Sequence, residues 1–323
     1  MFSFFSPQAL HFGRGQAAQT TTLAAGFGTH VLIVHGSNAA RAAWLIEDCR
    51  AAGLSVTTQS CGSEPSLPAL EAALARVSAD RPDVVVALGG GSVIDFAKAL
   101  AALIPCAGAP LDYLEGVGGG KPLDRAPLPM IALPTTAGTG AEVTKNAVIA
   151  VPEHGVKVSL RDARMIPDIA IVDAGLMQGA PRRVTLAAGL DAVTQVIEPY
   201  LSVKATPMTD ALCQAAIPKG LAALRAVVEH DAAEAWDDMA WVSTCGMTSS
   251  GMAPLCTRPE MKSNSVAPAD RKPISISLTP TLTSRSKKRR FFSAFIGSIS
   301  DWLPSRMSVD SQRGGAVMTR LGH

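Results

Sequence analysis

The sequence predicts an α/β protein with a doubly wound parallel sheet at its N-terminal end, followed by the start of an all-helical domain. Three apolar runs carry the prediction: His30–His35 (HVLIVH), Asp83–Leu88 (DVVVAL) and Met130–Leu133 (MIAL). Such continuous runs are typical of parallel strands that are buried on both faces. Helical segments follow the first two runs, and strands that alternate with helices predict a doubly wound sheet.

The other elements of this part continue the alternation. The apolar segment near the N-terminus predicts a strand and lacks the basic start of a signal peptide. Leu54–Gln59 alternates as a strand does, Ser66–Ser78 spaces its leucines helically, and Ala170–Asp173 predicts one more short strand. We therefore expect an α/β domain over residues 1–180.

Helical patterns replace strand patterns after Ala180. Val184–Leu201 and Thr209–Val228 both predict helices, the second despite Pro218. We expect residues 181–242 to begin a helical domain. Residues 243–323 are rich in Ser, Thr and Pro without a sustained period, which predicts an aberrant, poorly ordered tail.

Charge is distributed unevenly along the chain. From Arg258 onward there are 12 basic and 4 acidic residues, whereas residues 1–257 carry 17 basic and 23 acidic ones, so the tail is basic. The run Ser286–Arg290 (SKKRR) has an alternative interpretation as a patch for nucleic acid or anionic lipid, but no aromatic platform or amphipathic pattern accompanies it. We expect neither nucleic acid nor a membrane as a partner.

The cysteines indicate a reducing compartment. The six cysteines form no CxxC pair, which argues against a zinc cluster or a disulfide framework and favours a cytoplasmic location. No run of about 18 apolar residues predicts a transmembrane helix.

A glycine-rich loop follows the second apolar run directly. Gly89, Gly90, Gly91 and Ser92 stand between DVVVAL and the helical stretch VIDFAKALAAL. Small residues let the backbone approach a pyrophosphate, and the free amides at the start of a helix favour anionic oxygens. The alternative is a tight strand-to-helix turn without a ligand.

A second loop, PTTAGTGAEVT, follows the third apolar run and contains Thr135, Thr136 and Thr139. In a parallel sheet both loops open at the carboxyl edge, where their hydroxyl and amide groups would meet one ligand. The alternative for this loop alone is a polar turn whose threonines cap helices.

Asp191 and Gln195 stand four residues apart in AAGLDAVTQVIEPYLS. This spacing places them on one helical face, where they would serve as two ligands of one metal ion. A solvated surface pair is the alternative interpretation.

Together these segments resemble the iron-containing, or group III, alcohol dehydrogenase family. The resemblance runs from about residue 4 to about residue 240 and is carried by the motifs GGGSVIDFAKAL, PTTAGTGAEVTKNAVI, KVSLRDARMIPDIAIVDAGL and AAGLDAVTQVIEPYLS. It implies a dinucleotide-binding α/β domain, a helical metal-binding domain, and hydride transfer between NAD(P) and a small alcohol or aldehyde. A maleylacetate-reductase-like substrate and a homodimer are further expectations.

The resemblance also assigns residues. Its pyrophosphate site corresponds to the glycine loop with Asp95 in support, the threonine loop lies on the ribose and nicotinamide side, and Lys157 matches a cofactor-contacting lysine. Where many members have an acid for the adenosine 2′-hydroxyl, this chain has Gly36, Ser37 and Asn38. Without that acid NADP would not be repelled, and the alternative is a loop that tolerates either cofactor.

The metal site implied by the resemblance is incomplete in this sequence. Asp191 matches the first ligand and Gln195 takes the place of a histidine, whereas His323 is the only histidine after His230. A ferrous or zinc ion needs several fixed ligands to polarise an alcohol oxygen. Two hypotheses follow: an NAD(P)-dependent alcohol dehydrogenase, or a catalytically inactive, truncated relative that binds a dinucleotide at most.

Overall fold

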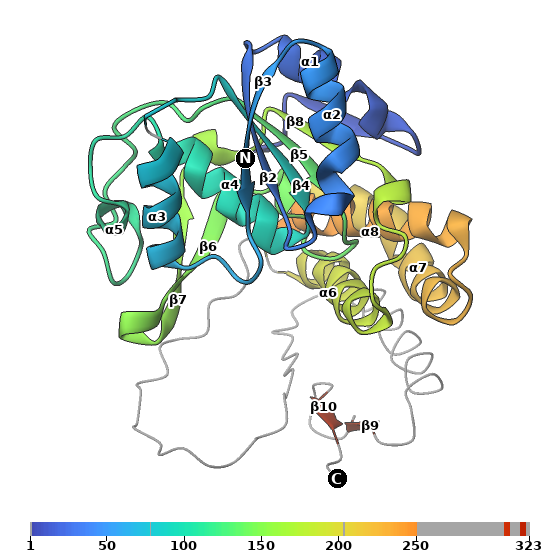
Figure 1. The fold of residues 1–323 in the computed structure, drawn as a ribbon. Helices are drawn as coiled ribbons and strands as arrows, with labels where there is room; N and C mark the ends of the chain where they lie inside the picture. The colour runs from blue at the N-terminus through green and yellow to red at the C-terminus, as the bar shows by residue number, and fades with distance from the viewer. Residues whose placement is uncertain (1, 78, 203, 251–306, 311–316, 321–323) are drawn as a thin grey trace.

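The computed structural model describes residues 2–77, 79–202, 204–250, 307–310 and 317–320. A six-stranded sheet, with the order β1-β8-β5-β4-β2-β3, forms the N-terminal part, and all of its paired strands run parallel (Figure 1). Its strands are β1 (Ala9–Phe12), β2 (His30–His35), β3 (Ser55–Ser60), β4 (Val84–Gly89), β5 (Met130–Pro134) and β8 (Ile169–Val172). The predicted α/β fold class is confirmed.

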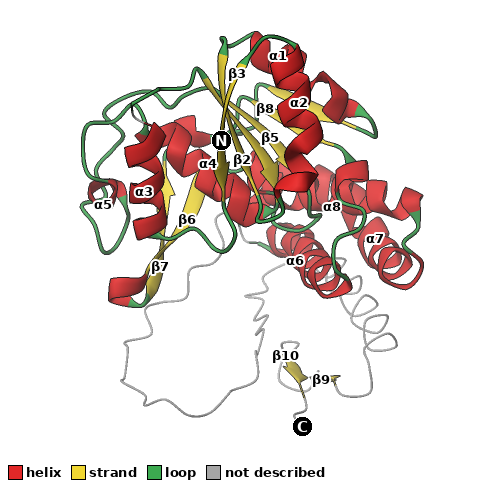
Figure 2. Cartoon of the chain, in the orientation of Figure 1, coloured by secondary structure: helices red, strands yellow, loops and turns green. Residues whose placement is uncertain are grey.

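Helices cover both faces of the sheet (Figure 2). The helices of this part are α1 (Thr20–Ala25), α2 (Ala43–Ala51), α3 (Leu67–Val77), α4 (Gly91–Leu103) and the short α5 (Pro110–Tyr113). Along β2, Val31 and Ile33 share a core with α1 and α2, whereas Leu32 and Val34 share a core with α3 and α4. Strands β2, β4, β5 and β8 are therefore buried at every position, because their alternate side chains enter two different cores, whereas the edge strands β1 and β3 are partly exposed.

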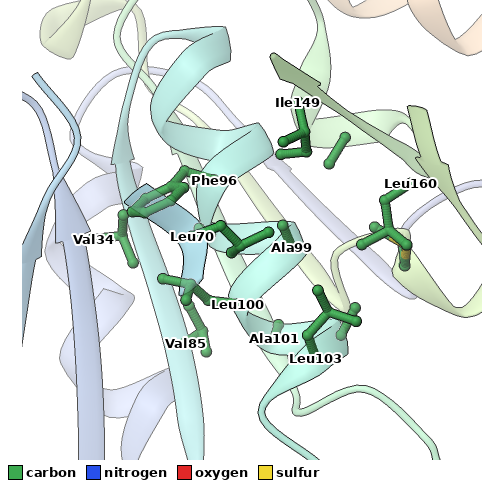
Figure 3. Packing of buried hydrophobic residues seen from close by; sticks show 14 of the residues in the cluster. Val34, Leu70, Val85, Phe96, Ala99, Leu100, Ala101, Leu103, Ile149 and Leu160 are labelled. Atoms are coloured by element: carbon green, nitrogen blue, oxygen red, sulfur yellow. The ribbon is translucent and has the colours of Figure 1, made fainter. Parts of the chain in front are cut away.

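Helix α4 is the central helix of the second core (Figure 3). Phe96 and Leu100 lie with Val34 and Val85 of the sheet and with Leu70 of α3 in one buried cluster. The same cluster includes residues of a hairpin that the sequence analysis did not predict, made of antiparallel strands β6 (Asn146–Val151) and β7 (Val156–Arg161). The helix that follows the glycine loop is thus held from three sides.

A helical layer packs at one end of the sheet. It consists of α6 (Arg182–Leu201), α7 (Pro207–His230) and α8 (Ala233–Ser250), which contact one another. Helix α8 continues past residue 242, where we expected the helical part to end, because the side chains of Ser243, Thr244 and Cys245 are buried. Most of the predicted tail lies outside the described residues; β9 (Met307–Asp310) and β10 (Val317–Arg320) pair antiparallel within it.

Within the described part of the chain, α7 is the one helix with the length and apolar composition of a membrane span. Core helices share these properties, and α7 packs between its neighbours with Cys213, Ile217 and Leu224 buried. A capping box of Thr206 and Thr209 fixes its start. Its apolar composition therefore serves the packing of the helical layer.

Short 3-10 helices connect several of these elements. They are η1 (Gln16–Gln19), η2 (Ala39–Ala42), η3 (Ala141–Val143), η4 (Pro152–His154), η5 (Ala163–Met165) and η6 (Ala174–Leu176). Two of them matter for the site, since η2 follows the loop after β2 and η3 ends the threonine loop.

Candidate nucleotide-binding site

The strand order reverses at β2. From β2 the chain moves to β3 on one side and then to β4 on the other, so the carboxyl ends of β2 and β4 flank a topological switch point. The register pairs His35 with Leu88 and Gly89 with Pro134. The three predicted loops therefore leave one edge of the sheet side by side, at the place where ligands bind in such folds.

The glycine and threonine loops touch. The Thr135 amide donates a hydrogen bond to the Gly89 carbonyl oxygen at 3.0 Å. A Cβ built on Gly91 would lie 2.6 Å from Thr139 Oγ1, and one on Gly90 would lie 3.3 Å from Thr136. The absence of side chains at Gly90 and Gly91 permits this close approach at the start of α4, where the first backbone amides of a helix have no carbonyl partner within the helix and favour an anion.

The threonine loop also meets the helical layer through its glycines. A Cβ on Gly138 would lie 2.6 Å from the Ala188 carbonyl oxygen in α6, and one on Gly140 would lie 2.4 Å from Met247 Cβ in α8. Gly140 has a φ of +50°, which glycine adopts without strain. One loop therefore contacts the glycine loop on one side and two helices on the other.

A cleft of about 270 Å³ opens between these segments. Of the residues predicted to bind the cofactor, it is lined by Gly91, Ser92, Asp95, Thr139 and Lys157. At its rim Lys157 Nζ lies 2.6 Å from Glu64 Oε1, and both side chains are more than half exposed. The structure therefore brings these five predicted residues together around one space.

The loop after β2 is at the same edge but does not line this cleft. Asn38 caps η2, since its side-chain oxygen accepts a hydrogen bond from the Ala40 amide at 3.1 Å. Gly36 has open space around it, and Ser37 lies near Gly62. Arg41 of η2, which follows this loop, donates to the Leu176 carbonyl oxygen at 3.0 Å.

Two threonines also lie away from the cleft. Thr136 lines a small apolar cavity of about 10 Å³ beside Ala188 and Trp236, and Thr135 follows β5 with its amide bound to Gly89. Their backbone is part of the threonine loop, but neither side chain faces the larger space.

Lys98 is a charged residue that the sequence analysis missed. Its side chain is fully buried in α4, and Nζ lies 3.1 Å from Asp95 Oδ1. The ammonium group also donates to the Ala141 carbonyl oxygen at 3.0 Å, to Thr144 Oγ1 at 2.9 Å, and to the Asn146 carbonyl oxygen. The spacing of Asp95 and Lys98 in an otherwise apolar helix was the available signal.

Glu142 was missed as well and is buried beside Lys98. Its Oε1 accepts a hydrogen bond from Thr244 Oγ1 of α8 at 3.4 Å, whereas Oε2 has no hydrogen-bond partner among the residues described. Burial raises the pKa of Glu142 to about 7, against the attraction of Lys98 and the Thr244 hydrogen bond. Burial also lowers the pKa of Lys98, with Asp95 opposing this shift.

Asp191 and Gln195 lie on one face of α6, as predicted. Gln195 Nε2 donates a hydrogen bond to Asp191 Oδ2 at 2.7 Å, so the amide binds the carboxylate that would hold a metal. Burial raises the pKa of Asp191, and burial followed by repulsion from Asp191 raises the pKa of Glu198. Over residues 2–250, leaving aside 78 and 203, no group of three His, Cys, Asp or Glu side chains could hold a metal. This donor set does not fit an iron or zinc ion.

Comparisons with known proteins agree with this architecture. The family model described as iron-containing alcohol dehydrogenase matches residues 7–174, and the model of the family's C-terminal part matches residues 185–262. The second match passes residue 242, as α8 does.

Relatives resemble the chain over part of their length. It is 39% identical to the probable alcohol dehydrogenase EutG of Escherichia coli over 63% of this chain and 50% of that protein. It is 32% identical to the NAD-dependent methanol dehydrogenase of Bacillus methanolicus over 65% of this chain and 56% of that protein. The chain spans about half the length of the curated relatives it matches.

Solved structures show the same fold. A 1,3-propanediol oxidoreductase superposes with a TM-score of 0.73 at 28% identity, covering 79% of this chain and 67% of the other. A sulfoacetaldehyde reductase of Bifidobacterium kashiwanohense in complex with NAD⁺ gives a TM-score of 0.72 at 28% identity, covering 79% and 68%. Given the two family matches and the shared arrangement of sheet, loops and helical layer, the chain belongs to the iron-containing alcohol dehydrogenase family.

Proposed function

We propose that the cleft binds a nicotinamide dinucleotide and that the chain is an oxidoreductase by descent, transferring hydride between the nicotinamide and a small alcohol or aldehyde. The contact between Gly91 and Thr139 is the observation that carries this proposal. It joins two loops at the switch point and presents the start of α4 to an anionic ligand. Ser92 lines the same cleft with Lys157 at the rim, and Gly89 and Gly90 precede Gly91 in the loop.

The positions of the loops indicate where the pyrophosphate and the adenosine ribose of the cofactor would lie. The pyrophosphate belongs at Gly91 and Ser92, and the adenosine ribose belongs toward Gly36, Ser37 and Asn38 at the neighbouring strand end. No carboxylate stands in that last loop, so a 2′-phosphate meets no repulsion there. We propose that NADP is accepted as well as NAD, while a maleylacetate-like carbonyl compound is one candidate for the substrate.

Binding and turnover are separate questions for this chain. The part that the structure describes offers Asp191 and Gln195, which bind each other, and no group of three His, Cys, Asp or Glu side chains that could hold a metal. This observation favours the second candidate function, a protein that binds the dinucleotide without catalysing hydride transfer. We derive no catalytic step through a metal for that reason.

Titration of the purified full-length chain with NADH and, separately, NADPH tests the binding proposal by nucleotide fluorescence. Saturable binding supports it, and binding of neither nucleotide contradicts it. Metal analysis and NAD(P)H consumption with short aldehydes then decide between the two candidates. Turnover that depends on added ferrous iron or zinc would establish the enzyme, whereas binding without turnover would establish the binding protein.

Location and assembly complete the proposal. We propose a cytoplasmic protein, because the described cysteines Cys49, Cys61, Cys106, Cys213 and Cys245 are free thiols.

We also propose a homodimer, for which the apolar edge strand β1 offers a surface: Leu10 is 44% exposed and Phe12 37%. Light scattering coupled to size exclusion measures the assembly directly.

A further inference from the structure

Helix α8 docks along one of its faces onto the sheet part of the molecule. Asp237, Trp241 and Thr244 follow one another at intervals of four and three residues, so they share that face. The Thr244 hydroxyl donates to Glu142 at the end of the threonine loop, and Met247, one turn later, lines the cleft. Among the described residues that line the cleft, Met247 is the one that comes from the helical layer. The position of α8 therefore sets part of the cleft wall.

Arg14, which follows β1 in the sequence, holds the other end of this face. Its Nε donates a hydrogen bond to Asp237 Oδ2 at 3.2 Å, and its Nη1 donates to Gln178 Oε1 at 3.1 Å. Its Nη2 donates to the carbonyl oxygen of Ala233, the first residue of α8. One planar guanidinium group therefore joins the edge of the sheet to the start of α8 and to the segment that leads into α6.

The loop that carries Arg14 is itself fixed to the sheet on both sides. The Gly13 amide donates to the Val172 carbonyl oxygen of β8 at 3.0 Å, and the Ala17 amide donates to Asp173 Oδ2 at 3.1 Å. Gly13 has a φ of +135°, which glycine adopts without strain. The guanidinium group is thus presented to α8 from a defined position on the sheet.

The contact between Arg14 and α8 combines charge with packing. Phe12, the last residue of β1, packs edge to face against Trp241, with ring centroids 5.7 Å apart. Asp237 Oδ1 is buried and has no hydrogen-bond partner among the residues described, so Arg14 supplies the charge that compensates this carboxylate. The side chains of Arg14 and Asp237 are 36% and 40% exposed, and an ion pair that water reaches is weak enough to open.

We propose that Arg14 is a positioning residue that latches the start of α8 to the edge of the sheet and thereby holds Met247 in the cleft wall, about 20 Å further along the helix. Helices α6, α7 and α8 share one buried core, so they move as one layer when the latch opens. Opening widens the cleft on the side of Met247. The consequence for ligand binding rests on the proposed function, whereas the docking of α8 does not.

A double-mutant cycle in the full-length protein tests the latch. Arg14→Ala removes the guanidinium group, Asp237→Ala removes the carboxylate, and the double variant removes both. Arg225→Ala is the matched control, because the ion pair of Arg225 with Glu229, at 3.1 Å, lies within α7 and does not reach the sheet.

Hydrogen exchange measures the docking of α8 without any nucleotide. In R14A we expect the amides of residues 233–247 to exchange at least about fivefold faster, with exchange in β4 unchanged, because β4 opens only with the whole sheet. D237A should show the same effect more weakly, the double variant should resemble R14A, and R225A should match the wild type.

Three results would overturn the latch. Unchanged exchange of α8 in R14A would mean that Arg14 does not hold this helix. Equal acceleration in α8 and β4 would mean that Arg14 contributes only to global stability. Additive effects of R14A and D237A would mean that the two residues act separately.

The NADH dissociation constant, measured by nucleotide fluorescence, tests the consequence for the cleft. We expect R14A to bind at least about threefold more weakly, which is within the range of a partly exposed ion pair, and R225A to bind as the wild type does. Faster exchange of α8 with wild-type affinity would overturn the link between the latch and the cleft wall. If the wild type binds no NADH, the proposed function fails by itself, and hydrogen exchange still decides whether Arg14 holds α8.

Discussion

The side chain of Thr139 fills the space that a side chain at Gly91 would need, with Oγ1 only 2.6 Å from the position of such a Cβ. The two residues belong to loops that leave neighbouring strands, and both line the cleft. The shape of the proposed phosphate site therefore depends on the absence of a side chain at Gly91.

Gly91→Ala should weaken dinucleotide binding by at least about tenfold, or about 1.4 kcal/mol. The added methyl must displace Thr139 or the start of α4, and overpacking of this kind moves the backbone. The measurement is the NADH fluorescence titration. Gly62→Ala is the control, because its Cβ would meet its nearest neighbour, Ser37 Cβ, at an ordinary 3.6 Å. If both variants bind NADH equally tightly, the glycine loop is not part of the nucleotide-binding site.

Glu142→Gln should change how stability depends on pH. The pKa of Glu142 is raised from 4.5 to about 7 in the folded protein. As the pH rises above about 4.5, this carboxyl group ionises in the unfolded chain before it ionises in the folded one. The wild type therefore loses stability as the pH rises from about 4.5 through 7. The loss is on the order of 3 kcal/mol by the linkage relation. The variant lacks an ionisable group here, and its difference from the wild type isolates this contribution.

Urea denaturation at several pH values between 4.5 and 8 gives the free energy of unfolding for both proteins. Glu64→Gln serves as the control, since Glu64 is 63% exposed in its pair with Lys157 and its replacement should leave the pH profile of stability nearly unchanged. Parallel profiles for the wild type and E142Q would show that the carboxyl group is not buried between the sheet and α8.

Cys245→Ser should destabilise the protein by about 1–2 kcal/mol, because it places a hydroxyl among apolar neighbours in the helical layer. Burial raises the pKa of the Cys245 thiol to about 12, so the native thiol should also resist alkylation at neutral pH. Cys106→Ser is the matched control at a half-buried position. A neutral C245S variant would mean that the helical core ends before residue 245.

Metal removal should leave the stability of the chain unchanged. Asp191 and Gln195 hydrogen-bond to each other, and a carboxylate with one amide holds a divalent ion weakly. Thermal unfolding of chelator-treated and zinc- or iron-supplemented protein should give Tm values within about 1 °C, because ligand stabilisation needs a concentration well above Kd. A clear rise in Tm with one metal would reveal a site that these two residues do not explain.

The sheet was predictable because the residues of each central strand indicate that strand without information from other parts of the chain. The run at Val84–Gly89 is apolar at every position, and such a run specifies burial on both faces without reference to the rest of the chain. The hairpin of Asn146–Val151 and Val156–Arg161 was not predicted, since its strands are half-buried and depend on their packing against α4. Its burial comes from a helix some 50 residues earlier.

The same distinction applies to the site. The glycine and threonine loops were found because each follows an apolar strand directly in the sequence. Lys98 and Glu142 were not found, because the groups that justify burying their charges come from elsewhere in the chain: Thr144 and Asn146 for Lys98, and Thr244 for Glu142. A sequence pattern shows a charged residue in an apolar helix but not the carbonyl groups that surround its ammonium.

The glycines of the threonine loop have a consequence for how this molecule tolerates change. At Gly138 and Gly140 the loop meets α6 and α8 without any side chain of its own between them. The main chain of the loop therefore packs directly against Ala188 at Gly138 and against the Met247 side chain at Gly140, so an added methyl group at either glycine would push the helical layer away from the nucleotide-binding part. Substitutions that reshape the region between the two parts should accumulate on the helices, since the loop has no room for a side chain at Gly138 or Gly140.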